Sequence, residues 1–274
     1  MGLLKIDESK CKRDGICASE CTSTIIKVSG NSYPVIEPEW ESMCMLCGHC
    51  VAVCPHGALS HESIPVEDSP TINTELLIDE DQAVQFLRSR RSIRFFQERP
   101  VEREKIQRLI EAARFAPTGS NSQLVEWLVL SDRGLLHKIA GMAVVWLRQL
   151  LQDNPQMVVN SPYLPLLIKA WDLGFDPVLR KATVLVIAVA PREALTGQTD
   201  VTLALSYFDL LAPTMGLGTC WAGLMQMALH AQPSIRELVG IPEGYPYQYP
   251  IMLGYPKMKY YRLPTRKPPK VTYL

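Results

Sequence analysis

The sequence predicts a small cysteine-rich module followed by a larger domain that contains both helices and strands. Seven of the eight cysteines lie between Cys11 and Cys54. A polar segment with prolines and acidic residues follows from Ser60 to Thr74, and such a composition is typical of a linker. Beyond it, apolar residues recur with the period of a helix, and one run is rich in β-branched residues. We therefore expect a first domain over residues 1–62, a linker over 63–75 and a second domain over 76–274.

Length and composition fit an ordinary globular protein. The chain has 274 residues, a net charge of zero, 47% apolar residues and 20% charged residues, and the length favours about two domains. The balanced charge gives no broad electrostatic case for binding nucleic acid or an anionic membrane. No apolar run reaches the length of a membrane span, and the N-terminus lacks the pattern of a secretory signal or a myristoylation site. We expect a cytoplasmic protein without a nucleic-acid or membrane partner.

The second group of cysteines has the spacing of an iron–sulfur motif. Cys44, Cys47, Cys50 and Cys54 follow the pattern C-x2-C-x2-C-x3-C, and Pro55 comes directly after the last of them. In this bacterial ferredoxin pattern three cysteines hold one cluster and the fourth holds the other. The group therefore predicts two clusters and a protein that transfers electrons.

The first group has the same spacing with one substitution. Asp14 stands where the pattern has its second cysteine. A carboxylate is a harder ligand and binds iron more weakly than a thiolate, so we expect one labile iron at this place. The first cluster is then 4Fe-4S with one oxygen ligand, or 3Fe-4S after the labile iron is lost. We assign Cys11, Asp14, Cys17 and Cys54 to the first cluster and Cys21, Cys44, Cys47 and Cys50 to the second.

Zinc and disulfides are the alternative uses of these cysteines. Zinc normally takes separated C-x2-C pairs that close a tetrahedral site of four ligands, whereas three cysteines here stand at two-residue gaps before a C-P pair. Disulfides are typical of secreted proteins, and the sequence shows no secretory signal. We therefore favour two iron–sulfur clusters. Nearby His49, His56 and His61 are interpreted as loop residues rather than ligands.

Two helices are expected early in the second domain. The segment 79–88 predicts a short helix. The segment 102–116 follows Pro100 and carries apolar residues on one face at helical spacing, so it predicts a longer helix that ends at Pro117.

Strands and a further helix are expected later in the chain. The segments 126–130 and 183–190 predict strands, and the continuous apolar run of the second suits the middle of a sheet. We expect Asp200 to cap a helix that continues to Leu217. Because that helix is apolar nearly all round, it must be buried centrally or at a subunit interface. The proline-rich C-terminal stretch is expected to run extended over a partner surface.

An arginine-rich segment follows the first of these helices. In the run Arg90-Arg91-Ser92-Ile93-Arg94, guanidinium groups and a hydroxyl could converge on one phosphate and form charge-assisted bonds. Runs of arginine are also common on solvated faces. The segment alone therefore leaves both interpretations open.

Together with three later motifs, this segment resembles the nitroreductase family of FMN enzymes. Arg90, Ser92 and Arg94 match the R-x-S-x-R element that opens the domain of that family. The resemblance covers about residues 75–274, and a ferredoxin resemblance covers 1 to about 60. The later matches keep the family's order: Ala116–Gln123 resembles A-P-S-x-x-N-x-Q, Gly216–Gly223 resembles G-L-G-x-C-W-x-G, and Leu253–Pro256 resembles the terminal strand.

The resemblance implies an α+β fold and a homodimer with two FMN molecules in its interface. It implies that the phosphate is held by Arg90, Arg91, Ser92, Arg94 and Arg266. It places Pro117, Thr118 and Asn121 of the partner chain at the isoalloxazine, with Gln123 nearby, and backbone groups of Trp221, Ala222 and Gly223 near flavin N5 and O4.

Some positions depart from the family pattern or allow another role. Thr118 replaces the usual serine, and Leu124-Val125 replaces a common Pro-Trp pair. We expect Cys220 to be a small buried residue beside the flavin rather than a nucleophile. The region 140–180 has two interpretations, an apolar lid over the flavin or plain packing in the core or dimer interface.

The implied cofactors predict an oxidoreductase in which the flavin, and no side chain, carries the chemistry. Electrons would enter singly through the clusters, collect on FMN and leave to an electron-poor organic acceptor such as a nitroaromatic or quinone. A ferredoxin or another low-potential donor would supply them, and the clusters would replace or supplement NAD(P)H. Two alternatives are an electron-transfer module between ferredoxin pools and a protein partner, and an iron or redox sensor. The natural substrate, the donor and the direction of electron flow do not follow from the sequence.

Overall fold

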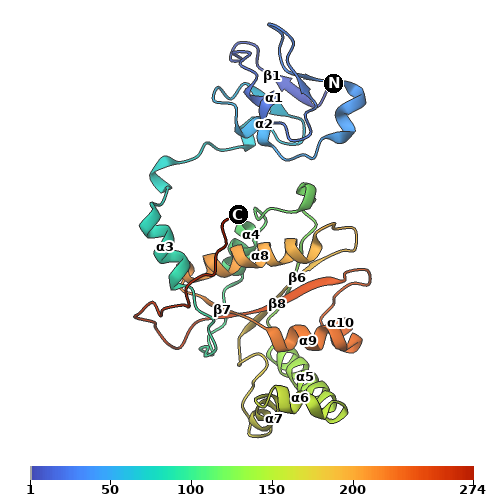
Figure 1. Cartoon of the computed structure of the whole chain (residues 1–274), viewed down its shortest axis with the longest axis vertical. Coiled ribbons are helices and arrows are strands. Elements are labelled where there is room, and N and C mark those ends of the chain that lie inside the picture. Colours follow the sequence, from blue (N-terminus) through green and yellow to red (C-terminus); the bar gives the residue numbers. More distant parts are fainter. Residues whose placement is uncertain (1) are drawn as a thin grey trace. The chain divides into compact units, whose positions relative to one another are not determined.

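The computed structural model describes residues 2–274 and divides into two compact units (Figure 1). One unit is Met1–Ile78 with Ser120–Ser122, and the other is Asp79–Gly119 with Gln123–Leu274. Each unit has a hydrophobic core of its own.

The first unit consists of short elements and two small antiparallel sheets. β1 pairs with β4, and β2 pairs with β3. Its core is small, and cysteine side chains from both predicted ligand groups pack against it. The elements are β1 (Leu4–Ile6), α1 (Ile16–Glu20), β2 (Ile26–Lys27), β3 (Val35–Ile36), α2 (His49–Ala52), β4 (Leu59–His61) and the 3-10 turns Pro38–Met43, Val66–Asp68 and Thr74–Leu76.

The second unit contains an antiparallel sheet of four strands in the order β5-β6-β8-β7. Both predicted strands are confirmed: one has the expected bounds, and the other begins one residue later than expected. All seven residues of β6 are buried, because β6 lies inside the sheet and helices cover both faces. The strands are β5 (Glu126–Leu130), β6 (Val184–Ala190), β7 (Gly218–Trp221) and β8 (Tyr247–Gly254).

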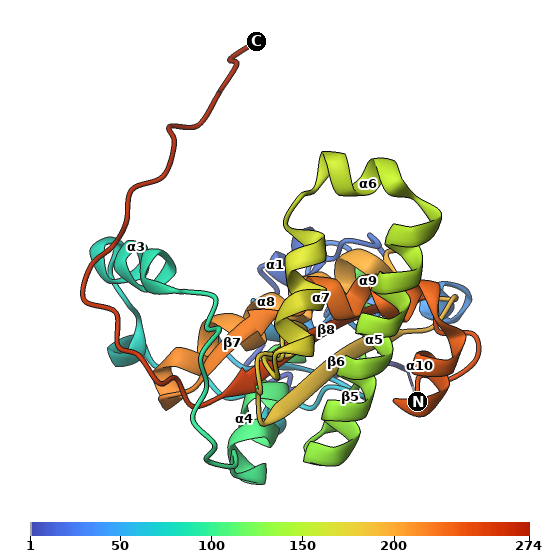
Figure 2. The ribbon, with the colours of Figure 1, turned by 90° about the horizontal axis from the view of Figure 1, so that it is seen from below.

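Helices pack on both faces of this sheet (Figures 1 and 2). Val184, Val186 and Ala188 of β6 contribute to one core with α4 and α8, whereas Leu185 and Ile187 contribute to another with α5, α9 and α10. This arrangement confirms the predicted α+β fold. The helices are α3 (Glu80–Ser89), α4 (Arg103–Ala113), α5 (Arg133–Asp153), α6 (Pro155–Asn160), α7 (Leu164–Asp172), α8 (Gly197–Leu211), α9 (Gly223–Ala231) and α10 (Pro233–Leu238), with 3-10 turns at Gly119–Asn121 and Ala212–Met215.

The first two predicted helices are present with adjusted ends. Asp79 and Gln82 form a reciprocal capping box at the start of α3, which fixes its first turn. α4 ends at Ala113 rather than at residue 116. Pro117 disfavours helical geometry at the residue before it, so the last residues of the predicted helix form a turn.

The prediction that Asp200 caps a helix reaching Leu217 is wrong at both ends. α8 begins at Gly197, and Asp200 lies inside its first turn. The Asp200 Oδ1 atom accepts hydrogen bonds from the Gly119 N–H at 3.1 Å and the Thr196 hydroxyl at 2.8 Å, so it does not cap the helix. After Leu211 the chain tightens into a 3-10 turn that ends at left-handed Gly216.

The C-terminal segment after Pro256 has no helix or strand, and residues 257–274 are exposed in the single chain. Figure 2 shows this segment leading away from the sheet. Its expected course over a partner surface stays a prediction.

Candidate cofactor sites

Two pockets in the first unit collect the residues of the two predicted ligand sets. All seven cysteines of these sets are free thiols. Within residues 2–274, no three His, Cys, Asp or Glu side chains are placed to hold a single metal ion; each set instead lines a pocket. One pocket is lined by Cys11, Asp14, Cys17 and Cys54, and the other by Cys21, Cys44, Cys47 and Cys50.

The backbone is built the same way around Asp14 and Cys47. The residue before each is left-handed, with φ of 58° at Arg13 and 51° at Leu46. The residue after each is a left-handed glycine, Gly15 at 73° or Gly48 at 72°, and a short helix follows. Asp14 therefore occupies the position that a cysteine occupies in the other set.

The donors around the pockets fit iron–sulfur groups. Thiolates are the ligands of such clusters, and hydrogen bonds to their sulfurs are part of a cluster site. The Ala58 N–H donates to Cys54 Sγ at 3.3 Å. The Asp14 carboxylate accepts from the Ile16 N–H at 3.2 Å and lies 3.8 Å from His56 Nε2.

The histidines near the cysteines do not share one environment. His61 is the last residue of β4 and is only 2% exposed, so its interpretation as a loop residue is wrong. Its Nε2 lies 3.6 Å from Cys44 Sγ, and burial lowers the pKa of the imidazole. His49 begins α2 and is exposed, and His56 lies in a turn. The sequence gives no sign of this difference, because Cys44 is 17 residues from His61.

The arginine segment of the second unit lies beside β7. Ser92 forms a parallel bridge with Thr219, and the Ile93 N–H donates to the Thr219 carbonyl at 2.8 Å. The approach requires a glycine at position 218, because a Cβ there would lie 2.4 Å from Ile93 Cγ1. The structure thereby brings Arg90, Ser92 and Arg94 to the strand that ends at Trp221.

A buried carboxylate that was not predicted organises this region. Asp209 of α8 is 4% exposed, and its Oδ2 accepts a hydrogen bond from Trp221 Nε1 at 3.0 Å. The Thr219 hydroxyl donates to Oδ1, and Arg90 Nη1 lies 3.7 Å from Oδ2. An aspartate among the apolar residues at the end of α8 was the available signal, since a buried charge requires partners.

Cys220 is a buried, neutral thiol in this arrangement. Burial raises its pKa, while the positive charges of Arg94 and Arg180 act in the opposite direction. The neighbouring Trp221 ring packs edge-on against Tyr249 with centroids 5.0 Å apart. Ala222 precedes α9, and Gly223 is its first residue.

Other predicted FMN contacts lie elsewhere. Both donated bonds of Arg91 Nη1 go to nearby carbonyls, at 2.9 Å to Arg88 and 2.7 Å to Arg90. Arg266 belongs to the exposed C-terminal segment, and Asn121 groups with the first unit.

The loop around Thr118 closes on itself. The Thr118 hydroxyl accepts from the Gln123 N–H at 3.0 Å. Both Pro117 and Gln123 are exposed in the single chain, and Gln123 is left-handed with φ of 52°. Their contact with a flavin stays a prediction.

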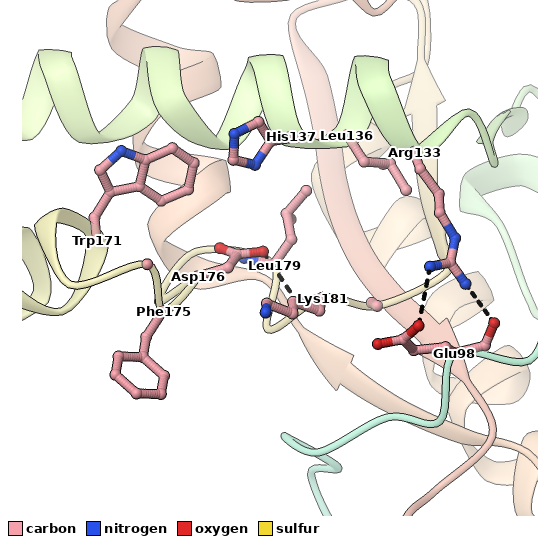
Figure 3. Close-up of a pocket in the computed structure, with 11 residues that line it drawn as sticks. Glu98, Arg133, Leu136, His137, Trp171, Phe175, Asp176, Leu179 and Lys181 are labelled. Atoms are coloured by element: carbon pink, nitrogen blue, oxygen red, sulfur yellow. Dashed lines mark hydrogen bonds and ion pairs between the residues drawn. The ribbon is translucent and has the colours of Figure 1, made fainter.

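The region 140–180 combines core packing with a cavity. α5 buries Ala140, Ala143 and Val144 against the sheet. Between the start of α5 and the loop after α7 lies a cavity of about 410 Å³ (Figure 3). His137 stacks on Trp171 on one side of it, with centroids 5.0 Å apart, while Arg133 at the other end turns to Glu98. A lid over the flavin stays a prediction.

The fold and the two motif regions have counterparts among known proteins. Residues 87–255 match the Nitroreductase family, and residues 38–60 match a 4Fe-4S binding domain. The chain therefore belongs to the nitroreductase family, and the predicted resemblance is confirmed. It is an oxidoreductase that carries an N-terminal 4Fe-4S binding domain.

Relatives by sequence come from different kinds of organism. A protein of Archaeoglobus fulgidus assigned as an NADH dehydrogenase/NAD(P)H nitroreductase is 27% identical over 177 residues, which covers 65% of this chain and 87% of that protein. Iodotyrosine deiodinase 1 of Rattus norvegicus is 24% identical over 217 residues, which covers 73% of this chain and 69% of that protein.

Solved structures share the fold of the second unit. A nitroreductase with bound FMN from Bacteroides fragilis is 17% identical with a TM-score of 0.57, and the match covers 72% of this chain and all of that one. A nitroreductase with bound FMN from Desulfitobacterium hafniense is 20% identical with a TM-score of 0.56, with the same coverage. Among residues 2–274, no helix has the length and apolar character needed to cross a membrane.

Proposed function

We propose that this chain is an FMN-dependent oxidoreductase that passes electrons between two iron–sulfur clusters and FMN and reduces an electron-poor organic acceptor, such as a nitroaromatic or a quinone. The observation that carries the proposal is that one chain holds both the pair of thiol-lined pockets and the Arg90–Arg94 segment beside β7. FMN in the solved nitroreductases of the same fold supports the choice of flavin. When bound, FMN supplies the electron-pair chemistry and the clusters supply one-electron transfer.

Side chains of the second unit bind and orient in this proposal. Arg90, Ser92 and Arg94 hold the FMN phosphate through charge-assisted hydrogen bonds. The Asp209 carboxylate faces Arg90 and fixes the indole of Trp221. It therefore orients one phosphate-binding group and one wall of the flavin site together.

Backbone groups at the start of α9 complete the flavin side of the site. Gly223 is the first residue of that helix, so its N–H has no intrahelical acceptor. We assign this N–H to hydrogen bonding at the flavin N5 and O4 edge, with Trp221 and Ala222 beside it. The Ala222 N–H itself donates to the Pro250 carbonyl at 3.0 Å. The neutral thiol of Cys220 adds no charge there.

A homodimer completes the proposed site. The exposed Pro117 and Gln123, together with Thr118 and Asn121, would then be supplied by the partner chain. Large apolar side chains that are exposed in the single chain, Phe115, Tyr207 and Met227, support burial against a second copy. Arg266 would contact the phosphate only if the C-terminal segment runs back towards the Arg90–Arg94 segment.

The test is anaerobic reduction of cofactor-loaded protein by a reduced low-potential ferredoxin, NADH and NADPH in separate experiments, followed by flavin absorbance. Cluster-fed chemistry predicts that the low-potential donor bleaches the flavin and that a nitroaromatic or quinone restores its colour. A variant with Cys47→Ala and Cys50→Ala should lose this route while keeping FMN. Equal rates with NAD(P)H in that variant would show that electrons do not enter through the first unit.

A low-potential protein donor fits the same scheme. The route through the clusters would accept electrons from a reduced ferredoxin, and omission of ferredoxin from a coupled assay should then stop turnover. Loss of one iron at Asp14 without any turnover would instead favour a redox sensor.

A further inference from the structure

We infer that His61 donates a hydrogen bond to the Cys44 sulfur and that it raises the reduction potential of the cluster in the second pocket. The inference rests on the proposed clusters. It concerns a contact that the cysteine spacing does not reveal.

The contact lies inside the pocket that collects the second ligand set. His61 and Cys44 both line this pocket. The His61 Nε2 and Cys44 Sγ atoms are 3.6 Å apart, a distance suited to a hydrogen bond to sulfur. The imidazole is 2% exposed and sits at the end of β4, so water does not compete for the contact and the strand fixes the ring.

The other ring nitrogen determines which atom carries the proton. His61 Nδ1 accepts a hydrogen bond from the Ser63 N–H at 3.0 Å. A nitrogen that accepts from a backbone N–H carries no hydrogen, and in a neutral imidazole the other nitrogen then carries it. The proton is therefore on Nε2, and the N–H is directed at Cys44.

The first pocket offers its ligands different partners. There the Ala58 backbone N–H donates to Cys54 Sγ, and His56 faces the carboxylate of Asp14 rather than a sulfur. A buried side-chain donor to a ligand thiolate is therefore a feature of the second pocket in the part of the chain that the structure describes.

The effect on potential follows from charge. Reduction adds negative charge to a cluster and its thiolates, and a donor directed at a thiolate stabilises the reduced form more than the oxidised form. Removing the donor should lower the midpoint potential of the second cluster. A tenfold change in the reduction equilibrium corresponds to 59 mV for one electron, and we expect a shift of at least this fold-change.

Two substitutions at this position separate the two nitrogens of the ring. His61→Asn keeps an acceptor where Nδ1 receives the Ser63 N–H but cannot reach Cys44. His61→Gln places an amide donor nearer to Nε2. His49→Asn is the matched control, because His49 lines the same pocket but is exposed.

The experiment is an EPR-monitored redox titration of each cluster-loaded protein, with iron and sulfide content measured beforehand. His61→Asn should lower the midpoint potential of the four-cysteine cluster. The midpoint potential of His61→Gln should lie closer to that of the wild type. Pulsed double resonance on the reduced wild type should detect a coupled proton that exchanges in D2O and that is lost in His61→Asn. The double-resonance signal needs only wild-type protein, so a poorly loaded variant does not remove the test.

Two results would overturn the inference: equal potentials in wild type and loaded His61→Asn, or no exchangeable proton at the cluster of the wild type. Protein that binds no second cluster would overturn both this inference and the proposed function. A shifted potential without electron transfer to FMN would overturn only the function.

Discussion

The indole of Trp221 donates a hydrogen bond to the buried carboxylate of Asp209, with 3.0 Å between Nε1 and Oδ2. This bond joins the end of β7 to the last turn of α8. The same carboxylate lies 3.7 Å from Arg90, so one side chain links a proposed phosphate ligand with a proposed wall of the flavin site.

Asp209→Ala should destabilise the protein and weaken FMN retention. The substitution leaves the Trp221 N–H and the Thr219 hydroxyl without their acceptor, and an unsatisfied buried donor costs about 1–3 kcal/mol. Asp209→Asn keeps an acceptor oxygen, so it should lose less stability and less FMN than Asp209→Ala. The measurements are urea unfolding and the fraction of FMN retained after gel filtration. If the alanine variant equals the asparagine variant in both, Asp209 does not organise this site.

Gly218→Ala should loosen the arginine segment. The added Cβ would lie 2.4 Å from Ile93 Cγ1, and overpacking of this kind costs about 1–3 kcal/mol. We expect a lower unfolding midpoint and weaker FMN binding. The double variant with Ile93→Ala removes the clashing atom. The losses of stability in the two single variants should therefore not add in the double variant. Strict additivity would contradict the close approach of Ile93 to β7.

The sequence predicts parts of this molecule whose signals are local. Cysteine spacing is enough to predict which cysteines line each of the two pockets, and an apolar run is enough to predict the position of β6. The roles of Asp209 and His61 could not be predicted from the sequence, because only the fold brings their partners, Trp221 and Cys44, close to them. The cap expected at Asp200 fails for the same reason, since the carboxylate bonds to the distant Gly119.

Asp14→Cys should make the first cluster resist loss of iron. The backbone around Asp14 has the same left-handed residues as that around Cys47, so a cysteine fits without rearrangement. A thiolate holds iron more firmly than a carboxylate. Mild oxidation should therefore yield a 3Fe-4S EPR signal in the wild type and a much smaller one in Asp14→Cys. Asp14→Ser is the control that should lose iron at least as fast as the wild type, and equal signals in all three proteins would exclude Asp14 as a ligand.

Glu102 should make stability depend on pH in the acid range. A hydrogen bond from the Tyr255 hydroxyl, with smaller contributions from its own backbone and from Arg99, lowers the pKa of Glu102 from 4.5 to about 2. Because the folded pKa lies below the unfolded value, the ionised carboxylate stabilises the folded state above pH 4.5. This contribution is lost as the pH falls from 4.5 towards 2.

The measurement is the difference in urea midpoint between the wild type and Glu102→Gln at a series of pH values. The difference should be constant near neutral pH and should shrink as the pH falls below 4.5. Tyr255→Phe removes the largest cause of the low pKa, so the pair Tyr255→Phe and Tyr255→Phe with Glu102→Gln should show a weaker pH dependence. Glu102 is on the surface, so added salt should reduce the part that comes from Arg99. If the difference in urea midpoint between the wild type and Glu102→Gln stays the same at every pH, Glu102 has the same pKa in the folded and unfolded states. The hydrogen bond from Tyr255 would then contribute nothing to stability.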